Sequence, residues 1–246
     1  MALIIGNYPQ NIKRSIKRFW QSRLAAVKKQ AAAGRSDQGN RSAVTGGKNL
    51  DGIADICAKL VPGNGLKAAT IHRQKRAVVL PGYFRPTKQW DLLVTLRNRL
   101  IAVLEFKSLC GPSFGNNANN RCEEALGSAV DFQTAVKEGA FGDGAKPFVG
   151  YLLLIEDAEK SRRPVQAISP HFETNSRFIR ASYIERMNVL CERMMQEGLY
   201  DAAALIVSPK SGAGNGEFTS ASDATSCKRF LSQFAGRIAA EVAAAL

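Results

Sequence analysis

Residues 90–109 read WDLLVTLRNRLIAVLEFKSL, and this stretch is the most informative part of the chain about its fold. Two apolar runs, at 90–96 and 100–106, have the composition and length of β-strands. Arg97-Asn98-Arg99 joins them, a connection of hairpin length that contains asparagine. The sequence therefore predicts two paired antiparallel strands here.

Charged residues lie at the ends of these two runs. Asp91 opens the first run, while Glu105 and Lys107 close the second. Because alternate side chains of a strand share a face, Glu105 and Lys107 point the same way and Phe106 turns to the opposite layer. If the strands pair, Asp91 lies opposite the end of the second strand. We therefore expect two carboxylates and one ammonium group to meet at a sheet edge.

Such a cluster is suited to metal-assisted chemistry on phosphates. Two carboxylates repel each other at short range unless a cation lies between them. Mg²⁺ prefers carboxylate oxygens and keeps several waters for a phosphate substrate. It polarises the scissile phosphate and lowers the pKa of a bound water, while Lys107 would orient that water or stabilise charge on the phosphate. The alternative interpretation is a purely structural Glu105–Lys107 ion pair on an edge strand.

The rest of the chain alternates between predicted strands and helices. Further strands are expected at 77–80, 147–155 and 202–207, and helices at 9–33, 50–60, 121–138, 180–197 and 223–246. Residues 34–48 read as a flexible stretch and 111–120 as a Gly/Asn-rich loop. This order predicts an α/β fold with a central mixed sheet flanked by helices. We expect a single domain over 1–246 with a basic N-terminal helical segment at about 1–48.

Charge is distributed unevenly along the 246 residues. The chain carries 34 Lys and Arg against 21 Asp and Glu, for a net charge of +13. Residues 1–100 hold 19 of the basic residues and 4 of the acidic ones. This asymmetry favours a polyanionic partner over a surface charge that only aids solubility. We expect Lys17 and Arg18, on the basic helix, to contact phosphates without reading sequence.

Several classes of protein are disfavoured. The five cysteines have no zinc-ligand spacing, and with only two histidines a His-metal nuclease is not expected. No run approaches the roughly 20 apolar residues of a membrane span. Residues 1–5 meet Gly6 and a polar turn, so no secretory signal is expected. These features predict a cytoplasmic protein with reduced thiols and no membrane partner.

The motif also resembles a known family. Asp91, followed fourteen positions later by Glu105-x-Lys107, resembles the PD-(D/E)xK nuclease signature. The block 105–132 is similar to the XhoI-type type II restriction endonucleases, as are the shorter runs 43–52 and 81–88. The chain departs from the signature at one position, where Trp90 stands in place of proline.

This resemblance implies a PD-(D/E)xK restriction-endonuclease-like fold and a function. The implied enzyme is a homodimer that cuts double-stranded DNA within the palindrome 5′-CTCGAG-3′, with Mg²⁺ as cofactor and a staggered cut leaving 5′ extensions. It would belong to a restriction-modification system whose cognate methyltransferase acts on the same site without necessarily binding this chain. Asp91 and Glu105 would be the metal ligands and Lys107 the catalytic lysine.

Additional acidic groups sometimes join such sites. Asp51 and Asp55, spaced i,i+4 on one helix face, are candidates, although both suit a surface role equally. Glu123 and its neighbour Glu124 are second candidates, with negative charge in the first turn of a helix as the alternative.

Base recognition is expected from the loop residues Asn116, Asn117, Asn119, Asn120 and Arg121. Asparagine pairs with adenine and arginine with guanine in the major groove. The alternative is an ordinary loop in which Asn120 caps the next helix. Two rival functions also stay open, namely a repair or transposition nuclease of the same fold and a non-catalytic DNA-binding protein.

Overall fold

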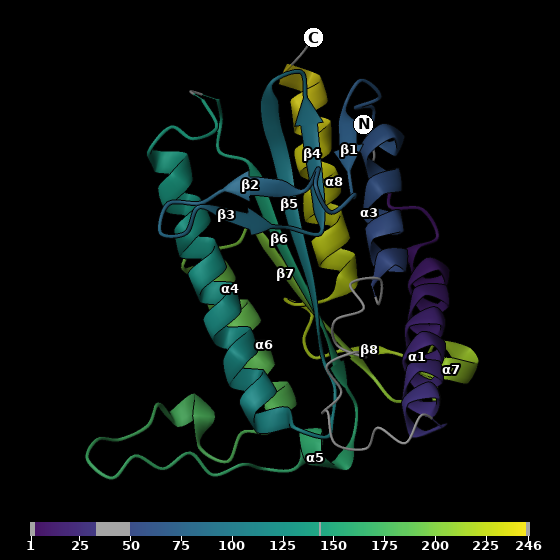
Figure 1. Ribbon diagram of the computed structural model, residues 1–246, viewed down its shortest axis with the longest axis vertical. Coiled ribbons are helices and arrows are strands. Elements are labelled where there is room, and N and C mark those ends of the chain that lie inside the picture. The colour runs from purple at the N-terminus through teal and green to yellow at the C-terminus, as the bar shows by residue number, and fades with distance from the viewer. Residues whose placement is uncertain (1–2, 33–49, 143, 245–246) are drawn as a thin grey trace.

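A mixed β-sheet forms the centre of the molecule. The computed structural model describes residues 3–32, 50–142 and 144–244. Within them six strands pair in the order β1-β4-β5-β6-β7-β8 (Figure 1). These strands are β1 (Thr70–His72), β4 (Leu92–Leu96), β5 (Arg99–Leu109), β6 (Phe148–Glu156), β7 (Ala202–Ser208) and β8 (Thr219–Ser220). The three strands β5, β6 and β7 run parallel and the other pairs antiparallel, which confirms the predicted α/β class with a mixed sheet.

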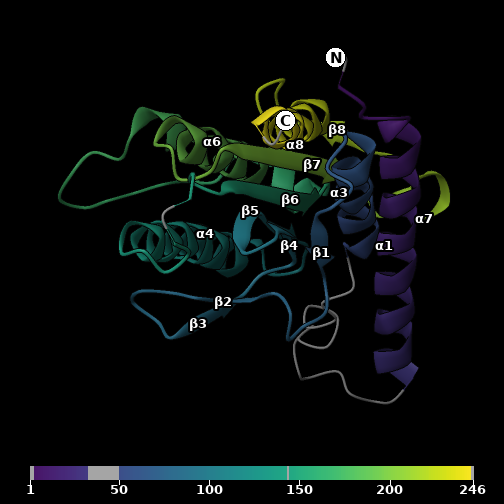
Figure 2. The same cartoon turned by 90° about the horizontal axis from the view of Figure 1, so that it is seen from above.

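Helices cover both faces of this sheet (Figures 1 and 2). The helices on one face are α1 (Tyr8–Ala32), α3 (Asp51–Gly63) and α8 (Cys227–Ala244), and those on the other are α4 (Phe114–Lys137) and α6 (Tyr183–Gln196). Parallel neighbours need a crossover connection, and α4 and α6 supply it between β5, β6 and β7. The short helices α5 (Glu159–Arg162), η1 (Ser176–Phe178) and α7 (Gly212–Asn215) lie in the loops. None of the helices in the described part of the chain combines the length and apolar character of a membrane span.

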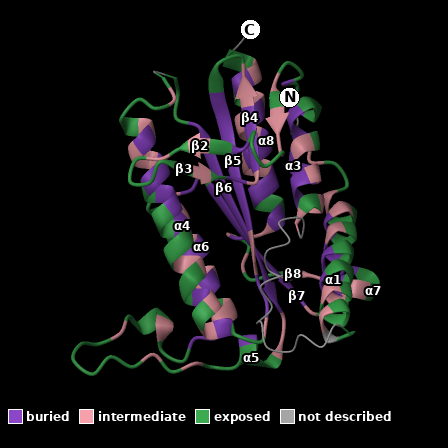
Figure 3. Ribbon diagram, in the orientation of Figure 1, coloured by how far each residue is buried: buried purple, intermediate pink, exposed green. Residues whose placement is uncertain are grey.

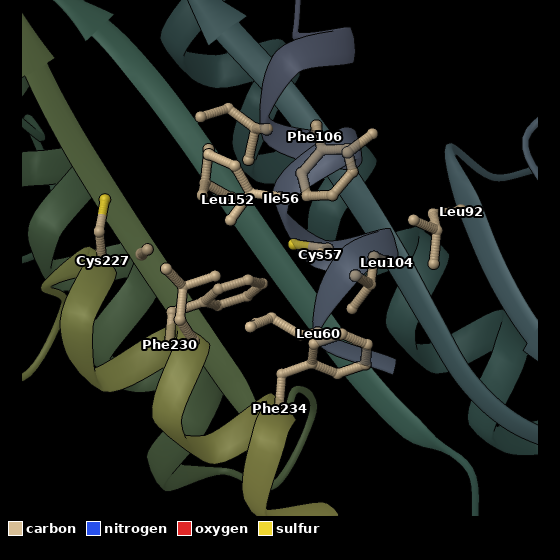
Figure 4. Close-up of a cluster of buried hydrophobic side chains, with 14 of the residues drawn as sticks. Ile56, Cys57, Leu60, Leu92, Leu104, Phe106, Leu152, Cys227, Phe230 and Phe234 are labelled. Atoms are coloured by element: carbon tan, nitrogen blue, oxygen red, sulfur yellow. The ribbon is translucent and has the colours of Figure 1, made fainter. Parts of the chain in front are cut away.

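The two faces of the sheet carry two apolar clusters, and the central strands β6 and β7 between them are buried along their whole length (Figure 3). In Figure 4, Leu104 and Phe106 of β5 meet Cys57 of α3 and Phe230 and Phe234 of α8. Alternate residues of β5, such as Val103 and Leu109, face α4 and α6 instead. The alternation expected around Phe106 is therefore confirmed.

Pairing between β4 and β5 leaves a notch in the sheet. The two strands form the predicted hairpin around Arg97-Asn98, with Arg97 in the left-handed region at φ 54°. Their last paired residues are Leu92 and Leu104, whereas β5 continues to Leu109 beside β6 alone. β5 lies between β4 and β6 in the sheet order, but beyond Leu104 only β6 is paired with it, and there Glu105 and Lys107 form an ion pair at 2.8 Å. The expected sheet edge is therefore this notch, where β5 has no β4 residue paired beside it.

The predicted loop at 111–120 is wrong, because α4 begins at Phe114. Phe114 and Ala118 are buried one helical turn apart and pack with the cluster under α4. This burial outweighs the low helix propensity of the glycine and asparagines. Asn120 therefore lies inside the helix and does not cap it, and Glu123 is not in a first turn, which holds no acidic residue.

Other boundaries differ from the prediction. The strand expected at 77–80 pairs as β2 (Val79–Pro81) with β3 (Thr87–Gln89) in a hairpin outside the main sheet. Helix α3 continues through Pro62, which costs its last turn one hydrogen bond without ending it. Arg23 lies on the expected basic face of α1 but is buried, at 6% exposed. The stretch 34–48 lies outside the described residues.

Candidate active site

Asp91 is fixed at the notch by two main-chain hydrogen bonds. Its backbone N–H donates to the Leu104 carbonyl at 3.2 Å. Its Oδ2 atom accepts from the Phe106 N–H at 2.7 Å. The Asp91 carboxylate thus accepts the hydrogen bond that a strand paired with β5 would otherwise accept. This bond holds Asp91 beside Glu105 and Lys107.

Glu105 is a buried carboxylate with two ammonium partners. Its side chain is 1% exposed. The Nζ atoms of Lys107 and Lys88 lie 2.8 Å and 2.7 Å from the same oxygen, Oε1. The other oxygen, Oε2, is buried and has no hydrogen-bond partner among the described residues. One carboxylate oxygen of Glu105 is therefore doubly paired and the other is left without a partner.

The charges of this cluster influence one another. Burial opposes ionisation of Glu105, but the ammonium groups of Lys107 and Lys88 outweigh it and hold the pKa of Glu105 below its usual value. The pKa of Lys107 is raised, because Glu105 and Asp91 outweigh the effect of burial. Burial lowers the pKa of Lys88 and raises that of Asp91. The two lysines therefore differ, since burial dominates only for Lys88.

A cleft of about 460 Å³ opens at the notch. Asp91 and Lys107 line it from the sheet, Asp51 from α3, and Arg121 and Glu124 from α4. Glu105 does not line this cleft, because the two lysines cover it. Carboxylates and cations here share one accessible hollow, which suits a phosphate accompanied by a metal ion.

The fold gives the additional acidic candidates different access to the cleft. Asp51 lines the cleft, and its backbone carbonyl accepts from Arg73 at 3.1 Å. Both carboxylates form ion pairs with Arg73, that of Asp51 at 4.0 Å, but Asp55 does not line the cleft. Glu123 is exposed on α4 outside the cleft, whereas its neighbour Glu124 lines it.

The residues expected to bind DNA lie on two helices. Four of them share the first turns of α4, where all are exposed or half-buried and none lines the cleft: Asn116, Asn117, Asn119 and Asn120. Arg121 does line it, donates to the Ser108 carbonyl at 3.1 Å and pairs with Glu124. Lys17 and Arg18 are exposed on α1.

Sequence reasoning missed Lys88. This lysine lies on β3, outside the strands that carry the motif, and reaches Glu105 across the sheet face. Its Nζ atom is 4.4 Å from the ring centroid of Trp90, the residue that replaces the proline of the signature. The available signal was the spacing of Lys88 and Trp90 by two residues. Such residues share a face in extended chain, so Lys88 could have been expected on the same face as Trp90, directly before Asp91.

The residues present fit a magnesium ion. Within the described residues no group of three or more His, Cys, Asp or Glu side chains is placed to hold a metal ion, so protein groups would supply only part of its ligands. The site offers the carboxylate of Asp91 at the cleft and the buried carboxylate of Glu105. The Oε2 atom of Glu105 has no hydrogen-bond partner among the described residues. Two carboxylates, with water and phosphate completing the shell, is a usual arrangement for Mg²⁺.

Comparison with known proteins identifies the chain. Residues 29–220 match the family described as restriction endonuclease XhoI. The type II restriction enzyme AbrI of Azospirillum brasilense is 49% identical over 172 residues, which cover 70% of this chain and 77% of the relative. XhoI of Xanthomonas vasicola is 45% identical over 199 residues (80% and 79%), and BstVI of Geobacillus stearothermophilus is 40% identical over 222 residues (88% and 98%). No solved structure matches.

These relatives, together with the α/β fold and the charged cleft, define the class as type II restriction endonucleases, which are deoxyribonucleases. The chain belongs to the XhoI family of these enzymes. The rival functions of a repair or transposition nuclease and of a non-catalytic DNA-binding protein are therefore set aside.

Proposed function

We propose that the enzyme makes a double-strand cut within 5′-CTCGAG-3′ by hydrolysing one phosphodiester per strand at the notch. The observation that carries this proposal is the meeting of Asp91, Glu105 and Lys107 beside an accessible cleft. The resemblance of 105–132 to XhoI-type enzymes supports the choice of target. A PD-(D/E)xK fold is proposed with it, since Asp91 directly precedes β4 and Glu105 and Lys107 lie on β5, the strand paired with β4.

Asp91 and Glu105 would hold Mg²⁺ in this proposal. The bound ion supplies Lewis acidity toward the scissile phosphate and a water of lowered pKa. The main-chain hydrogen bond to Phe106 keeps the Asp91 carboxylate oriented at the mouth of the notch. Asp51 is the further acidic candidate that shares the cleft. Asp55 and Glu123 are positioned less well for this role, because neither lines it.

Lys107 would act directly on the DNA. It lines the cleft, and its raised pKa keeps it charged at neutral pH. An ammonium group in this position stabilises negative charge that develops on the phosphate, or orients the attacking water. Arg121, at the same cleft, is placed to approach the backbone or the bases. The exposed or half-buried Asn116, Asn117, Asn119 and Asn120 remain candidates for base contacts.

The biological setting follows from the same proposal. We propose that residues 1–246 act as one endonuclease domain in the bacterial cytoplasm, as a homodimer, within a restriction-modification system. The cognate methyltransferase would modify the same palindrome without necessarily binding this chain. Lys17 and Arg18, exposed on α1, would add contacts to phosphates.

Plasmid cleavage tests the proposal. Two plasmids that differ only in one CTCGAG site are incubated with the enzyme and either Mg²⁺ or EDTA. We expect one linear product from the plasmid that contains the site, only with Mg²⁺, and end sequencing should give 5′ extensions. Discrete products from both plasmids would assign a different target, a smear would contradict site specificity, and no cleavage would contradict the catalytic site.

A further inference from the structure

We propose that Lys88 is a positioning residue of this active site, holding Glu105 in place so that Lys107 is free to act on the DNA phosphate. The proposal deepens the proposed function and rests on the role given there to Lys107. Two lysines that contact the same carboxylate oxygen would thus have different roles: Lys88 stays paired with Glu105, and Lys107 acts on the phosphate.

The two lysines differ in their access to the cleft. Both Nζ atoms contact Glu105 Oε1, at 2.7 Å for Lys88 and 2.8 Å for Lys107. The Lys88 side chain is 10% exposed and does not line the cleft, whereas that of Lys107 is 27% exposed and does. Only Lys107 can therefore reach a phosphate that enters from solvent without a rearrangement of β3.

Lys88 is held in place from several directions. Its ammonium group lies over the Trp90 ring, and its Cα pairs with Leu80 in the β2–β3 hairpin. The turn of this hairpin is fastened to α4 through Asp131. A lysine on such a support has little freedom to leave Glu105.

The fastening involves three donors from the hairpin turn. Asp131 Oδ1 accepts the backbone N–H groups of Tyr83 and Phe84 at 2.8 and 2.7 Å, and Oδ2 accepts Arg85 Nε at 2.8 Å. A Cβ atom at Gly82 would collide with the Asp131 carboxylate, so this close approach requires glycine. The hairpin that carries Lys88 is therefore tied to the same helix that borders the cleft.

Burial of Glu105 explains why a second lysine is needed. If Lys107 turned toward a phosphate in a chain without Lys88, the buried Oε1 atom of Glu105 would lose both of its ammonium partners. Removing one partner of a buried ion pair is strongly unfavourable. With Lys88 in place Glu105 stays paired, so Lys107 can move without that penalty and the orientation of the Glu105 carboxylate is preserved.

Single-turnover cleavage of a duplex containing the site, at saturating Mg²⁺, is the first test. Lys88→Met should slow cleavage roughly 10- to 100-fold, the loss expected when a reacting group is slightly misplaced. Duplex affinity should stay within about twofold of the parent, because Lys88 does not line the cleft. Lys88→Arg should restore part of the rate. The control Lys228→Met, at an exposed position on α8, should match the parent.

A double-mutant cycle on unfolding gives a second readout that does not depend on activity. Lys88→Met should lower the midpoint of urea unfolding in the parent but much less in a Glu105→Gln background, where the buried charge is gone. A lysine that serves only packing would have equal effects in both backgrounds. Lys88→Gln, which also removes the charge, gives the same comparison if Lys88→Met does not fold.

Two outcomes would overturn the proposal. One is cleavage by Lys88→Met at the parent rate, and the other is equal destabilisation in the two backgrounds. Failure of the proposed function is distinguishable, because Lys107→Ala would then cleave normally while the unfolding cycle still reports on the Lys88–Glu105 pair.

Discussion

At the scale of single residues, the candidate site depends on how Asp91 and Glu105 are held. Asp91 is oriented by a main-chain N–H that would otherwise bind a strand partner. Glu105 is oriented by two ammonium groups on one oxygen. Both carboxylates are thus fixed before any ligand arrives, which lowers the cost of reorganisation during the reaction.

Replacement of Lys107 tests the catalytic role of the motif. Lys107→Ala should reduce single-turnover cleavage by roughly 100-fold or more, since it removes a charge expected at the reacting phosphate. The fold should persist because Lys88 still pairs with Glu105, and specific duplex binding should remain measurable in a gel-shift assay. Lys228→Ala serves as the control. Cleavage by Lys107→Ala near the parent rate would show that the motif is misassigned.

Asp131 predicts a pH-dependent contribution to stability. Burial opposes its ionisation, but Arg85 and the N–H groups of Tyr83 and Phe84 lower its pKa below 3.8. Its stabilising contribution is therefore complete above about pH 4 and is lost as pH falls through the lowered pKa. Asp131→Asn should reduce the free energy of unfolding by about 1–3 kcal/mol at pH 7.

That difference should shrink as pH approaches 3, when urea unfolding is followed between pH 7 and pH 3. Glu173→Gln, at an exposed loop position, provides the control and should change little at either pH. A constant difference between Asp131→Asn and the parent over this range would contradict the assigned role of the carboxylate.

At the scale of elements, the ends of helices contribute to stability, and an exposed helix face is expected to contribute to DNA binding. Ser182 caps α6 by accepting the Glu185 N–H at 3.2 Å, and Glu185 accepts the Ser182 N–H at 2.6 Å. Ser113 occupies the corresponding position of α4 but makes no side-chain cap bond. The two serines therefore form a matched pair for measuring the cap.

Ser182→Ala should lower the free energy of unfolding by about 1 kcal/mol, the usual contribution of such a cap. Ser113→Ala should change it much less, because its side chain makes no cap bond. Urea unfolding at pH 7 measures both variants. Equal losses of stability for the two serines would argue that the reciprocal bonds at Ser182 add nothing.

The exposed basic face of α1 predicts electrostatic binding to DNA. Charge reversal of Lys17 and Arg18 should weaken binding to every duplex, whatever its sequence. It should also reduce the slope of log affinity against log salt by about one unit for each phosphate that the helix no longer neutralises. The same reversal of Lys228 and Arg229, an exposed neighbouring pair on α8, serves as the charge-matched control. Equal salt slopes for the α1 variant and the parent would place this helix away from the DNA.

At the scale of the whole molecule, each chain provides one candidate site, and one site hydrolyses one phosphodiester. A double-strand cut in a palindrome therefore favours a pair of chains related by a twofold axis, the commonest closed assembly. Phe230 and Phe234, whose sequence pattern suits either a core or an interface, are buried in the core. Any interface must be formed by other surfaces.

Sedimentation of the free enzyme at micromolar concentration should give about twice 26.7 kDa. The same assembly should persist on a duplex that contains the site. A monomer both free and on that duplex would contradict the symmetric dimer and would require the two strands to be cut in sequence.

The class of enzyme, the β4–β5 hairpin and the Asp91–Glu105–Lys107 motif were all predictable from the sequence. Strand alternation is a local property, so it correctly predicted that Glu105 and Lys107 share a face opposite Phe106. The start of α4 was not predictable from composition, because burial of Phe114 and Ala118 against the sheet overrides the propensity of the asparagines around them.

The remaining members of the charged cluster became visible only in the folded chain. Lys88 is separated from Glu105 by 17 positions and reaches it because the β2–β3 hairpin folds back over the sheet. Likewise, Asp51 and Asp55 have identical spacing signals, yet only Asp51 lines the cleft. The physical reason is that periodicity along a strand or helix assigns a side chain to a face, while the packing of elements against one another determines what that face meets.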